Sequence, residues 1–474
     1  MFISCEAELS RRAFLKRSSQ LAAMGAASSY AIGLAGISEA AAFSNVQDYK
    51  ALVCVFLYGG NDHGNTLIPF DPENYGRYAA IRGGQGEDGG GIALSRSSLA
   101  NTVLATPNDQ VLSFDQTYAL APTMPRLKSR FDQGVMAPVL NVGPLQAPMT
   151  RAQYDNRSVP RPAKLFSHND QQATWQSSSP EGAPTGWGGR MSDLAQSANT
   201  NAMFTAINAT GNAVFLSGQQ AVPYKVSGNG ATLFRPLRNN RLYRSSGAAD
   251  ALDTILRTGT GNILAADHAS MNDRSITFGG FVNDAVANST VTTDFGSDNR
   301  LAGQLRTVAS MIAARGSLGV KRQVFMVSIG GFDNHDGLIG RHEALLAQVD
   351  FAMDAFYRSL LELGVANQVT TFTASDFGRT LASNGDGSDH GWGGFHFVLG
   401  GAVNGGRFYG RAPEVSVEGN DQVGRGRLLP SVSVDEYSST LAHWFGVAPS
   451  ELPSIAPNIG RFATPDLGFM TTAN

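Results

Sequence analysis

The sequence predicts an α/β protein with a mainly parallel central sheet. Continuous apolar runs of strand length recur along the chain, segments with helical periodicity lie between them, and glycine-rich turns follow several of the runs. Continuous apolar strands suit a sheet that is covered on both faces. Strands that alternate with helices are typical of βαβ units, in which a helix returns the chain to the start of the next parallel strand.

The predicted strands are apolar along their whole length. They cover residues 51–57, 135–142, 323–329, 369–373 and 395–399. Apolar residues recur at helical spacing from 345 to 361 and predict a crossover helix between the third and fourth strands. Residues 299–315 and 435–445 also have helical patterns, and either Ser433 or Asp435 is suited to cap the second of them.

The N-terminal 42 residues predict a cleaved twin-arginine export signal. Arg11 and Arg12 precede Phe14-Leu15-Lys16, an apolar stretch of small residues covers 21–37, and Ala40-Ala41-Ala42 offers a cleavage site. We therefore expect the twin-arginine translocation machinery to export the folded protein to the periplasm or the medium, without a stable membrane span after cleavage. The alternatives are an uncleaved membrane anchor or an arginine pair that occurs by chance.

The chain from residue 43 to 474 is predicted to form one domain with loop insertions. Residues 83–106 and 227–260 are rich in glycine and polar residues and lack strand or helix patterns. We expect both segments to be surface loops or insertions rather than independent domains.

Composition narrows the function classes. The net charge is −3 at pH 7, which argues against nucleic acid or an anionic membrane surface as the main partner. Cys54 is the one cysteine after the predicted signal, so no intrachain disulfide forms in the exported protein. Because Cys54 lies in the middle of an apolar strand, we expect a buried side chain and exclude this thiol as a nucleophile.

Aspartate and histidine residues gather in loops beside the predicted strand ends. They are Asp62, His63, Asp333, His335, Asp376, Asp389 and His390. Ligands bind at the carboxyl edge of open α/β sheets, where converging carboxylates and imidazoles need a compensating cation or hydrogen-bond network. We therefore predict a shared pocket with a divalent metal. Mixed Asp and His ligands suit zinc, manganese or iron, whereas an all-oxygen shell favours magnesium or calcium. The alternative is that these residues only form turns.

Several motifs resemble those of a bacterial domain-of-unknown-function family whose members carry twin-arginine signals. The motifs are the strand and turn at 52–62, Ser167-His168-Asn169-Asp170-Gln171-Gln172, Gly330-Gly331-Phe332-Asp333-Asn334-His335, Ser375-Asp376-Phe377-Gly378-Arg379-Thr380, Asp389-His390-Gly391-Trp392-Gly393-Gly394 and the helix at 435–446. That family belongs to the alkaline phosphatase-like superfamily of phosphatases and sulfatases. The resemblance implies a three-layer α/β/α fold.

The resemblance also implies a metal site and an activity. The residues that correspond to superfamily metal ligands are Asp62, Asp333, His335, Asp376 and His390. Phe377 stands where the superfamily has a further histidine. The resemblance therefore implies an exported, metal-dependent hydrolase of phosphate or sulfate esters acting on a small molecule or polymer. The alternative is a catalytically degenerate member of the fold that acts as a binding or assembly factor at the cell envelope.

Two hydroxyl side chains are candidate nucleophiles. Ser167 precedes His168 at the start of a predicted helix over 169–176, where the helix dipole and a metal would lower the pKa of the hydroxyl. We predict Ser167 and His168 as the catalytic pair. Thr150 before Arg151 is the other candidate, and plain helix capping is the alternative for both hydroxyls.

Two further side chains are candidate substrate contacts. The guanidinium of Arg379 has the fork of donors that binds anionic oxygens, but it would also pair with a neighbouring carboxylate. Trp392 lies in a glycine-rich loop beside the predicted pocket. Its ring would contact substrate or close the loop by packing.

Overall fold

The structure is a computed structural model, and it describes residues 48–84, 91–211, 213–228, 230–231, 235–259 and 262–471. The predicted export signal at residues 1–42 lies outside these ranges. Within them, no helix has both the length and the apolar character that crossing a membrane requires.

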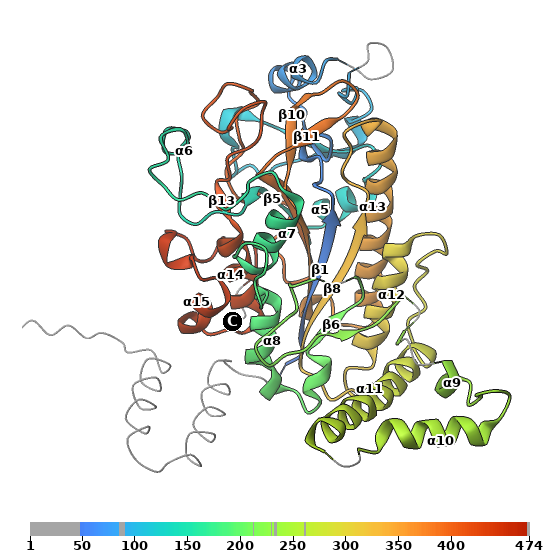
Figure 1. The fold of residues 1–474 in the computed structure, drawn as a ribbon. Helices are drawn as coiled ribbons and strands as arrows, with labels where there is room; N and C mark the ends of the chain where they lie inside the picture. The colour runs from blue at the N-terminus through green and yellow to red at the C-terminus, as the bar shows by residue number, and fades with distance from the viewer. Residues whose placement is uncertain are drawn as a thin grey trace, which may run out of the picture.

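An eight-stranded sheet forms the centre of the molecule (Figure 1). Its order is β13-β5-β12-β9-β1-β8-β6-β7. The strands are β1 (Lys50–Tyr58), β5 (Met136–Gly143), β6 (Ala206–Asn208), β7 (Tyr224–Lys225), β8 (Arg322–Gly330), β9 (Val369–Ser375), β12 (Gly394–Leu399) and β13 (Val432–Ser433). All five predicted strands are therefore confirmed.

Strand β12 is the exception to the predicted parallel arrangement. It runs antiparallel to both of its neighbours, β5 and β9, whereas the other pairs in this sheet are parallel. A hairpin of β10 (Arg379–Ser383) and β11 (Ser388–His390) connects β9 to β12 in place of a crossover helix. Because the hairpin does not return the chain to the opposite edge, β12 starts at the edge where β9 ends.

Helices cover both faces of the sheet. On one side lie α5 (Pro125–Asp132), α12 (Arg300–Ala313) and the crossover helix α13 (Leu338–Glu362); on the other lie α7 (His168–Ser177), α8 (Trp187–Ala195), α14 (Val434–Phe445) and α15 (Leu452–Ile455). Residues of β1 alternate between the two cores: Val53 and Val55 pack on the first side, Cys54 and Phe56 on the second. The fold is thus three-layer α/β/α with a mainly parallel sheet, as predicted.

The predicted helices are present, although the crossover helix α13 begins at Leu338 rather than at residue 345. Asn299 caps α12, and Ser433 rather than Asp435 caps α14, where it forms a capping box with Glu436. The buried thiol of Cys54 has a raised pKa because of its burial, as expected for a packing residue.

The two predicted insertions contain more regular structure than expected. In the first, β3 (Val103–Leu104) joins β2 (Leu67–Pro69) and β4 (Tyr118–Leu120) in a small sheet beside α3 (Pro72–Ile81). In the second, α9 (Arg235–Arg238) and α10 (Ser246–Arg257) lie with α11 (Ile263–Ala287) in an arm beside the main body (Figure 1). The loop prediction was wrong for 246–257, because the glycine and polar residues that suggested it lie mostly before Ser245, the α10 cap.

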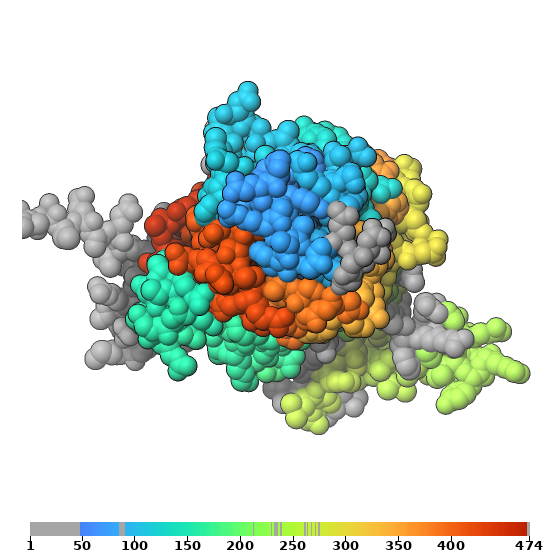
Figure 2. Space-filling view, turned by 90° about the horizontal axis from the view of Figure 1, so that it is seen from above, coloured from blue at the N-terminus to red at the C-terminus, as the bar shows by residue number. Residues whose placement is uncertain are grey.

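The pairing register brings the ends of the central strands to one level. Tyr58 of β1 pairs with Gly330 of β8, and Leu57 pairs with Ser375 of β9. Figure 2 views this edge end-on, with the segment after β1 (blue), the β10–β11 hairpin (orange) and the region of α6 (Arg151–Asn156) and α7 (teal) gathered on one face. The motif residues therefore meet at the carboxyl edge of the sheet.

Candidate metal centre

Three histidines and one aspartate converge at the carboxyl edge of the sheet, and we call them the histidine–aspartate cluster. His335 Nε2 lies 2.9 Å from His390 Nε2 and 3.1 Å from Asp333 Oδ1. His390 Nε2 lies 3.2 Å from the same oxygen, and His168 Nε2 lies 3.5 Å from Asp333 Oδ2. All four residues were predicted as site residues, with His168 predicted as catalytic rather than as a ligand.

Three separate elements deliver these side chains. Asp333 and His335 follow β8, His168 is the first residue of α7, and His390 ends β11. The turn after β1 touches the turn after β8 so closely that a Cβ on Gly59 would lie 2.4 Å from the backbone nitrogen of Asp333. Glycine also permits the positive φ of 114° at this position.

The Nδ1 atom of each histidine faces an oxygen outside the cluster. His390 Nδ1 lies 2.8 Å from the carbonyl oxygen of Phe166, His168 Nδ1 lies 2.6 Å from Asp376 Oδ2, and His335 Nδ1 lies 3.4 Å from Asp389 Oδ1. Such acceptors hold the proton on Nδ1 and leave the Nε2 lone pair pointing into the cluster. Metal-binding histidines are oriented in this way.

The Nε2 separations call for a cation between the rings. If Nδ1 carries the proton in both His335 and His390, two nitrogen lone pairs face each other at 2.9 Å. A shared proton or a metal ion removes that repulsion. Ligand atoms around tetrahedral zinc lie about 3.3 Å apart. The ligand atoms of His168, Asp333 and His390 all lie within 4.8 Å of one another, and His335 Nε2 lies 2.9 Å from His390 Nε2. The donor set therefore fits a divalent metal.

Asp376 supports the cluster from beneath His168. Its carboxylate is fully buried, and Oδ2 also accepts hydrogen bonds from the backbone N–H of Gly59 at 3.1 Å and from Gln172 Nε2 at 2.7 Å. The hydrogen bond that His168 Nδ1 donates to Asp376 is the main cause of the raised pKa of His168, which burial opposes. The structure thus places Asp376, predicted as a ligand, behind a histidine of the cluster.

Asp62 lies outside the cluster. Its carboxylate is fully buried against the equally buried guanidinium of Arg82, with Nη2 2.7 Å from Oδ1 and Nη1 3.2 Å from Oδ2. Ser388 Oγ donates to Oδ2 at 2.6 Å, and the Asn65 amide donates to Oδ1 at 2.9 Å. Burial alone would raise the pKa of Asp62, but Arg82 and nearby hydrogen bonds hold it well below its usual range. Both oxygens are thus occupied by protein groups.

Arg379 orients Asp333 and has no exposed surface. Its Nη1 donates to Asp333 Oδ1 at 2.8 Å and to the carbonyl oxygen of Gly59 at 3.1 Å, while Nε donates to the Ser388 carbonyl at 3.1 Å. Burial acts to raise the pKa of Asp333, but Arg379 and the histidines lower it on balance. Of the two roles weighed from the sequence, pairing with a carboxylate is the one this environment provides.

The two candidate nucleophiles differ in how their hydroxyls are used. Thr150 forms a capping box with Gln153 at the start of α6. Ser167 precedes α7 without capping it, and its Oγ donates instead to Asp170 Oδ2 at 2.9 Å. Phe166 has a positive φ of 73°, which is unusual for an aromatic residue and marks a strained approach to Ser167.

Aromatic rings close the cluster on its inner side. Phe377 is buried, and its ring centroid lies 4.9 Å from that of His168 and 4.8 Å from that of His390. Trp392 is fully buried, donates from Nε1 to the carbonyl oxygen of Pro144 at 2.8 Å and packs against Leu145. Its ring closes the loop by packing and has no exposed face for a substrate.

His63 is another buried residue at this edge. Its Nδ1 accepts a hydrogen bond from the Arg379 amide at 3.3 Å, and burial lowers its pKa to about 4. The ring is therefore neutral at pH 7 and lies outside the cluster.

Arg427 is a site residue that the sequence analysis missed. Its Nε donates to the carbonyl oxygen of His390 at 2.7 Å, and its guanidinium lies over the ring of Phe166, 5.0 Å from the centroid. The residue is half-buried, and burial lowers its pKa. No motif marks Arg427, because its place beside His390 depends on a loop that returns from a distant part of the chain.

Solved structures with related shapes are distant in sequence. They include the lipoteichoic acid synthase LtaP from Listeria monocytogenes, with 9% identity and a TM-score of 0.31 over 84% of this chain and 72% of that chain. Ps i-CgsB in complex with k-i-k-neocarrahexaose has 10% identity and a TM-score of 0.33 over 88% and 78%. A Bacteroides thetaiotaomicron structure described under the metabolism of multiple glycosaminoglycans has 11% identity and a TM-score of 0.33 over 86% and 75%.

One protein family matches most of the chain. Its model, described as protein of unknown function (DUF1501), matches residues 49–453. The chain belongs to this family. No curated protein matches the chain in sequence. The family match covers the strands and loops that build the histidine–aspartate cluster.

Proposed function

We propose that this member of the DUF1501 family is a metal-dependent hydrolase of phosphate or sulfate esters, exported by the predicted twin-arginine signal. One observation carries the proposal. The ligand atoms of His168, Asp333 and His390 all lie within 4.8 Å of one another, with His335 Nε2 beside them, and each histidine Nδ1 faces an acceptor outside the cluster. The ester class comes from the motif resemblance, because the cluster alone fits several metal-assisted hydrolyses.

The donor set favours zinc. His168 and His390 offer nitrogen ligands and Asp333 offers oxygen, and a further imidazole nitrogen, that of His335, lies 2.9 Å from His390 Nε2, whereas magnesium and calcium prefer shells of oxygen alone. When bound, a divalent metal of this kind supplies Lewis-acid polarisation of an ester oxygen. Manganese or iron at the same ligands would be compatible with the same proposal.

Neighbouring residues hold the ligands in place and recognise the substrate. Arg379 fixes Asp333, Asp376 and Gln172 fix His168, and Phe377 keeps water from the inner side of the rings. Arg427, beside His390, offers an anionic ester oxygen a half-exposed guanidinium. We assign Arg427 the anion contact that the sequence analysis gave to Arg379, because every Arg379 nitrogen already donates within the protein.

Ser167 is the nucleophile in this proposal. Its hydroxyl makes no capping hydrogen bond to α7 and donates instead to Asp170 Oδ2 at 2.9 Å, and Ser167 directly precedes His168 in the chain. When Ser167 Oγ attacks the phosphorus or sulfur atom of the ester, its proton passes to Asp170, which is nearly fully buried and within hydrogen-bond reach. The bond from that atom to the alcohol oxygen breaks, the alcohol leaves with a proton from solvent, and water then hydrolyses the seryl ester to release phosphate or sulfate and restore Ser167. The N-terminus of α7 favours negative charge at the same place.

Phe377 favours a second candidate function, an envelope binding or assembly factor. The resemblance implies a histidine there and hence a two-metal centre, but the structure has a packed phenyl ring. The described residues hold one group of histidine and carboxylate ligands close enough to share an ion. A protein with a metal-stabilised fold and no turnover would match this second candidate.

Ester hydrolysis by metal-loaded protein separates the two functions. Purified protein is freed of metal, reloaded with zinc or manganese, and assayed with 4-nitrophenyl phosphate and 4-nitrophenyl sulfate. We expect metal-dependent turnover of one ester and a loss of about 100-fold or more in Ser167→Ala and Asp333→Asn.

Thr150→Ala is the matched control, since Thr150 is also a hydroxyl residue before a helix but lies outside the cluster. It should keep turnover within a few-fold of the wild type. Loaded wild-type protein that hydrolyses neither ester faster than buffer would contradict the hydrolase and favour the binding factor.

A further inference from the structure

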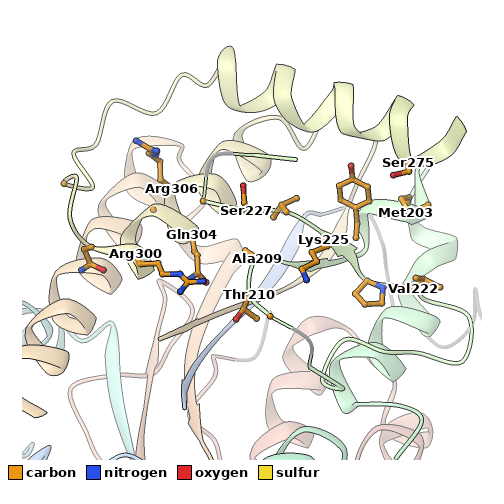
Figure 3. A pocket seen from close by; sticks show the side chains of 18 of the residues that line it. Met203, Ala209, Thr210, Val222, Lys225, Ser227, Ser275, Arg300, Gln304 and Arg306 are labelled. Atoms are coloured by element: carbon orange, nitrogen blue, oxygen red, sulfur yellow. The ribbon is translucent and has the colours of Figure 1, made fainter. Parts of the chain in front are cut away.

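A cleft separate from the histidine–aspartate cluster lies at the β6–β7 end of the central sheet. It has a volume of about 1300 Å³ and lies between the β6–β7 edge, α11 and the start of α12 (Figure 3). Its floor includes Thr210, just after β6, whose hydroxyl contacts the hydroxyl of Ser328 in β8. The residues of the histidine–aspartate cluster do not line it. The proposed hydrolase site makes no use of this cleft.

The charged side chains of the cleft are all cationic. Lys225, Arg300 and Arg306 line it, and none of the described lining residues is acidic. All three side chains are exposed, and none of them forms an ion pair with a carboxylate of the described residues. Most other arginines of the molecule with a described environment pair with a carboxylate or donate to a carbonyl, so three unpaired cations in one hollow are unusual here.

Arg300 stands at an unfavourable position for a cation. It is the first residue of α12, and Asn299 caps the helix there. The positive end of the helix dipole repels a cation in the first turn and attracts an anion. Arg300, Lys225 and Arg306 therefore add to a positive field that nothing in the described part of the cleft offsets. A bound anion would offset the repulsion among these three cations and the N-terminus of α12.

The side chains are arranged around the floor of the cleft. In Figure 3, Arg300 and Lys225 reach toward Thr210 from opposite sides, whereas Arg306 lies higher on α12. Gln304 keeps the floor fixed, because its side chain accepts from the Ser328 amide at 2.9 Å and donates to the Ser328 carbonyl at 2.9 Å. Cations on two sides of a rigid polar floor suit more than one anionic group.

The remaining walls favour an organic ligand over a lone ion. Met203, Val222, Pro223 and Tyr224 give the cleft an apolar side. The volume exceeds the range of about 300–1,000 Å³ that is usual for small-molecule pockets. We propose that this cleft binds an organic polyanion, a ligand that carries two or more phosphate or sulfate groups on a larger body. Lys225 and Arg300 bind the anionic groups, and the apolar wall contacts the body.

Anion-dependent thermal stability and binding test the proposal. The cleft variant is Lys225→Gln/Arg300→Gln. The control, Arg77→Gln/Lys128→Gln, removes the same charge from exposed ion pairs on α3 and α5. The probes are inorganic tripolyphosphate, sucrose octasulfate and uncharged sucrose, at physiological ionic strength. Two anionic probes separate a phosphate from a sulfate ligand.

We expect at least one anionic probe to bind wild type and control and to raise their Tm, and the cleft variant to lose about tenfold or more in affinity for it. Without a probe, the cleft variant should melt at the same or a higher temperature than wild type, because like charges are removed from the helix start. Retained binding in the cleft variant, an equal loss in the control, or no anion binding to wild type would overturn the proposal. The experiment measures anion binding and Tm, not zinc content or turnover. The polyanion cleft and the proposed hydrolase can therefore be contradicted independently of each other.

Discussion

Asp62 and Asp333 follow glycine-rich turns at the same edge of the sheet, one after β1 and the other after the neighbouring β8. Asp62 is fully buried and binds Arg82, Ser388 and the Asn65 amide. Asp333 has 43% of its side chain exposed and faces three histidines. The same residue type in matching places therefore serves as a structural ion-pair partner in one turn and as a candidate ligand in the other.

The difference lies in how many lone pairs the protein itself satisfies. Hydrogen bonds and Arg82 take up both oxygens of Asp62, and burial makes an unpaired charge there costly. Asp333 has one strong protein partner, Arg379, and its remaining contacts are with the Nε2 atoms of three histidines whose Nδ1 atoms face other acceptors. Asp333 therefore has an oxygen and neighbouring imidazoles available to a cation, whereas both oxygens of Asp62 are already paired with protein groups. The following predictions test this contrast.

Asp62→Asn should have the largest effect on stability. It leaves the guanidinium of Arg82 buried without a counter-charge, at a cost of about 3–5 kcal/mol. Urea unfolding of metal-free protein measures this free energy. Arg82→Met in the same chain should restore part of the loss, and Asp333→Asn should cost far less because Asp333 is partly exposed. Equal losses of unfolding free energy for Asp62→Asn and Asp333→Asn would contradict the assignment of a structural ion pair to Asp62 alone.

Asp376→Asn should weaken metal binding without removing a ligand. The change takes the charged acceptor from His168 Nδ1 and should lower zinc affinity by about 10–100-fold. Competition with a zinc-binding dye gives the affinity. Asp354→Asn is the control, since Asp354 lies on α13, away from the cluster, and pairs with Arg130 of α5 and Arg358 of α13. The role of Asp376 would be refuted by an unchanged affinity.

Buried histidines away from the cluster should make stability fall at mildly acidic pH. Burial lowers the pKa of His342 to about 4 and of His396 to about 3. As the pH falls below about 6.5, each of these histidines is protonated in the unfolded chain but stays neutral in the folded chain. The free energy of unfolding therefore has its full value above pH 6.5. It should fall by about 1.4 kcal/mol per pH unit for each histidine as pH drops from 6.5 toward 4.

Unfolding of metal-free His342→Gln at several pH values checks this. The variant should lose less stability over that range than the wild type. His443→Gln, at an exposed surface position, should leave the slope unchanged. Parallel pH curves for wild type and His342→Gln would show that the histidine is not held neutral.

The two candidate nucleophiles repeat the contrast on a smaller scale. Thr150 caps α6, so Thr150→Ala should cost about 1 kcal/mol. Ser167 does not cap α7, so Ser167→Ala should change the free energy of unfolding less while abolishing turnover. Thermal unfolding of both variants measures the difference, and a larger loss in Ser167→Ala would assign that hydroxyl a structural role.

The sequence predicts the fold better than the contacts within the site. Apolar runs locate the strands because burial on both faces requires them, and helical spacing locates α12, α13 and α14. The direction of β12 could not be predicted, since the 379–390 hairpin in place of a helix becomes evident only from its pairing. Residues 246–257 were missed because a cap and local ion pairs form α10 beside a segment of loop composition.

The motifs also identify which residues reach the edge, but not which of them meet. Asp333, His335 and His390 were predicted as ligands, and the structure brings them together with His168. Whether Asp62 is free depends on Arg82, which returns from the end of α3 in a tertiary contact that no local pattern encodes. Arg427 was not predicted either, because its contact with His390 is also a tertiary contact that no local pattern encodes.

Zinc stoichiometry and affinity show whether the histidine–aspartate cluster binds a metal ion. Metal-free wild type, His390→Gln and the exposed-histidine control His443→Gln are titrated with zinc against a competing dye. We expect about one tightly bound zinc per chain in wild type and His443→Gln, and a loss of that binding in His390→Gln. Wild-type protein that binds no zinc, or His390→Gln that binds it as tightly as wild type, would contradict the histidine–aspartate cluster as a metal centre.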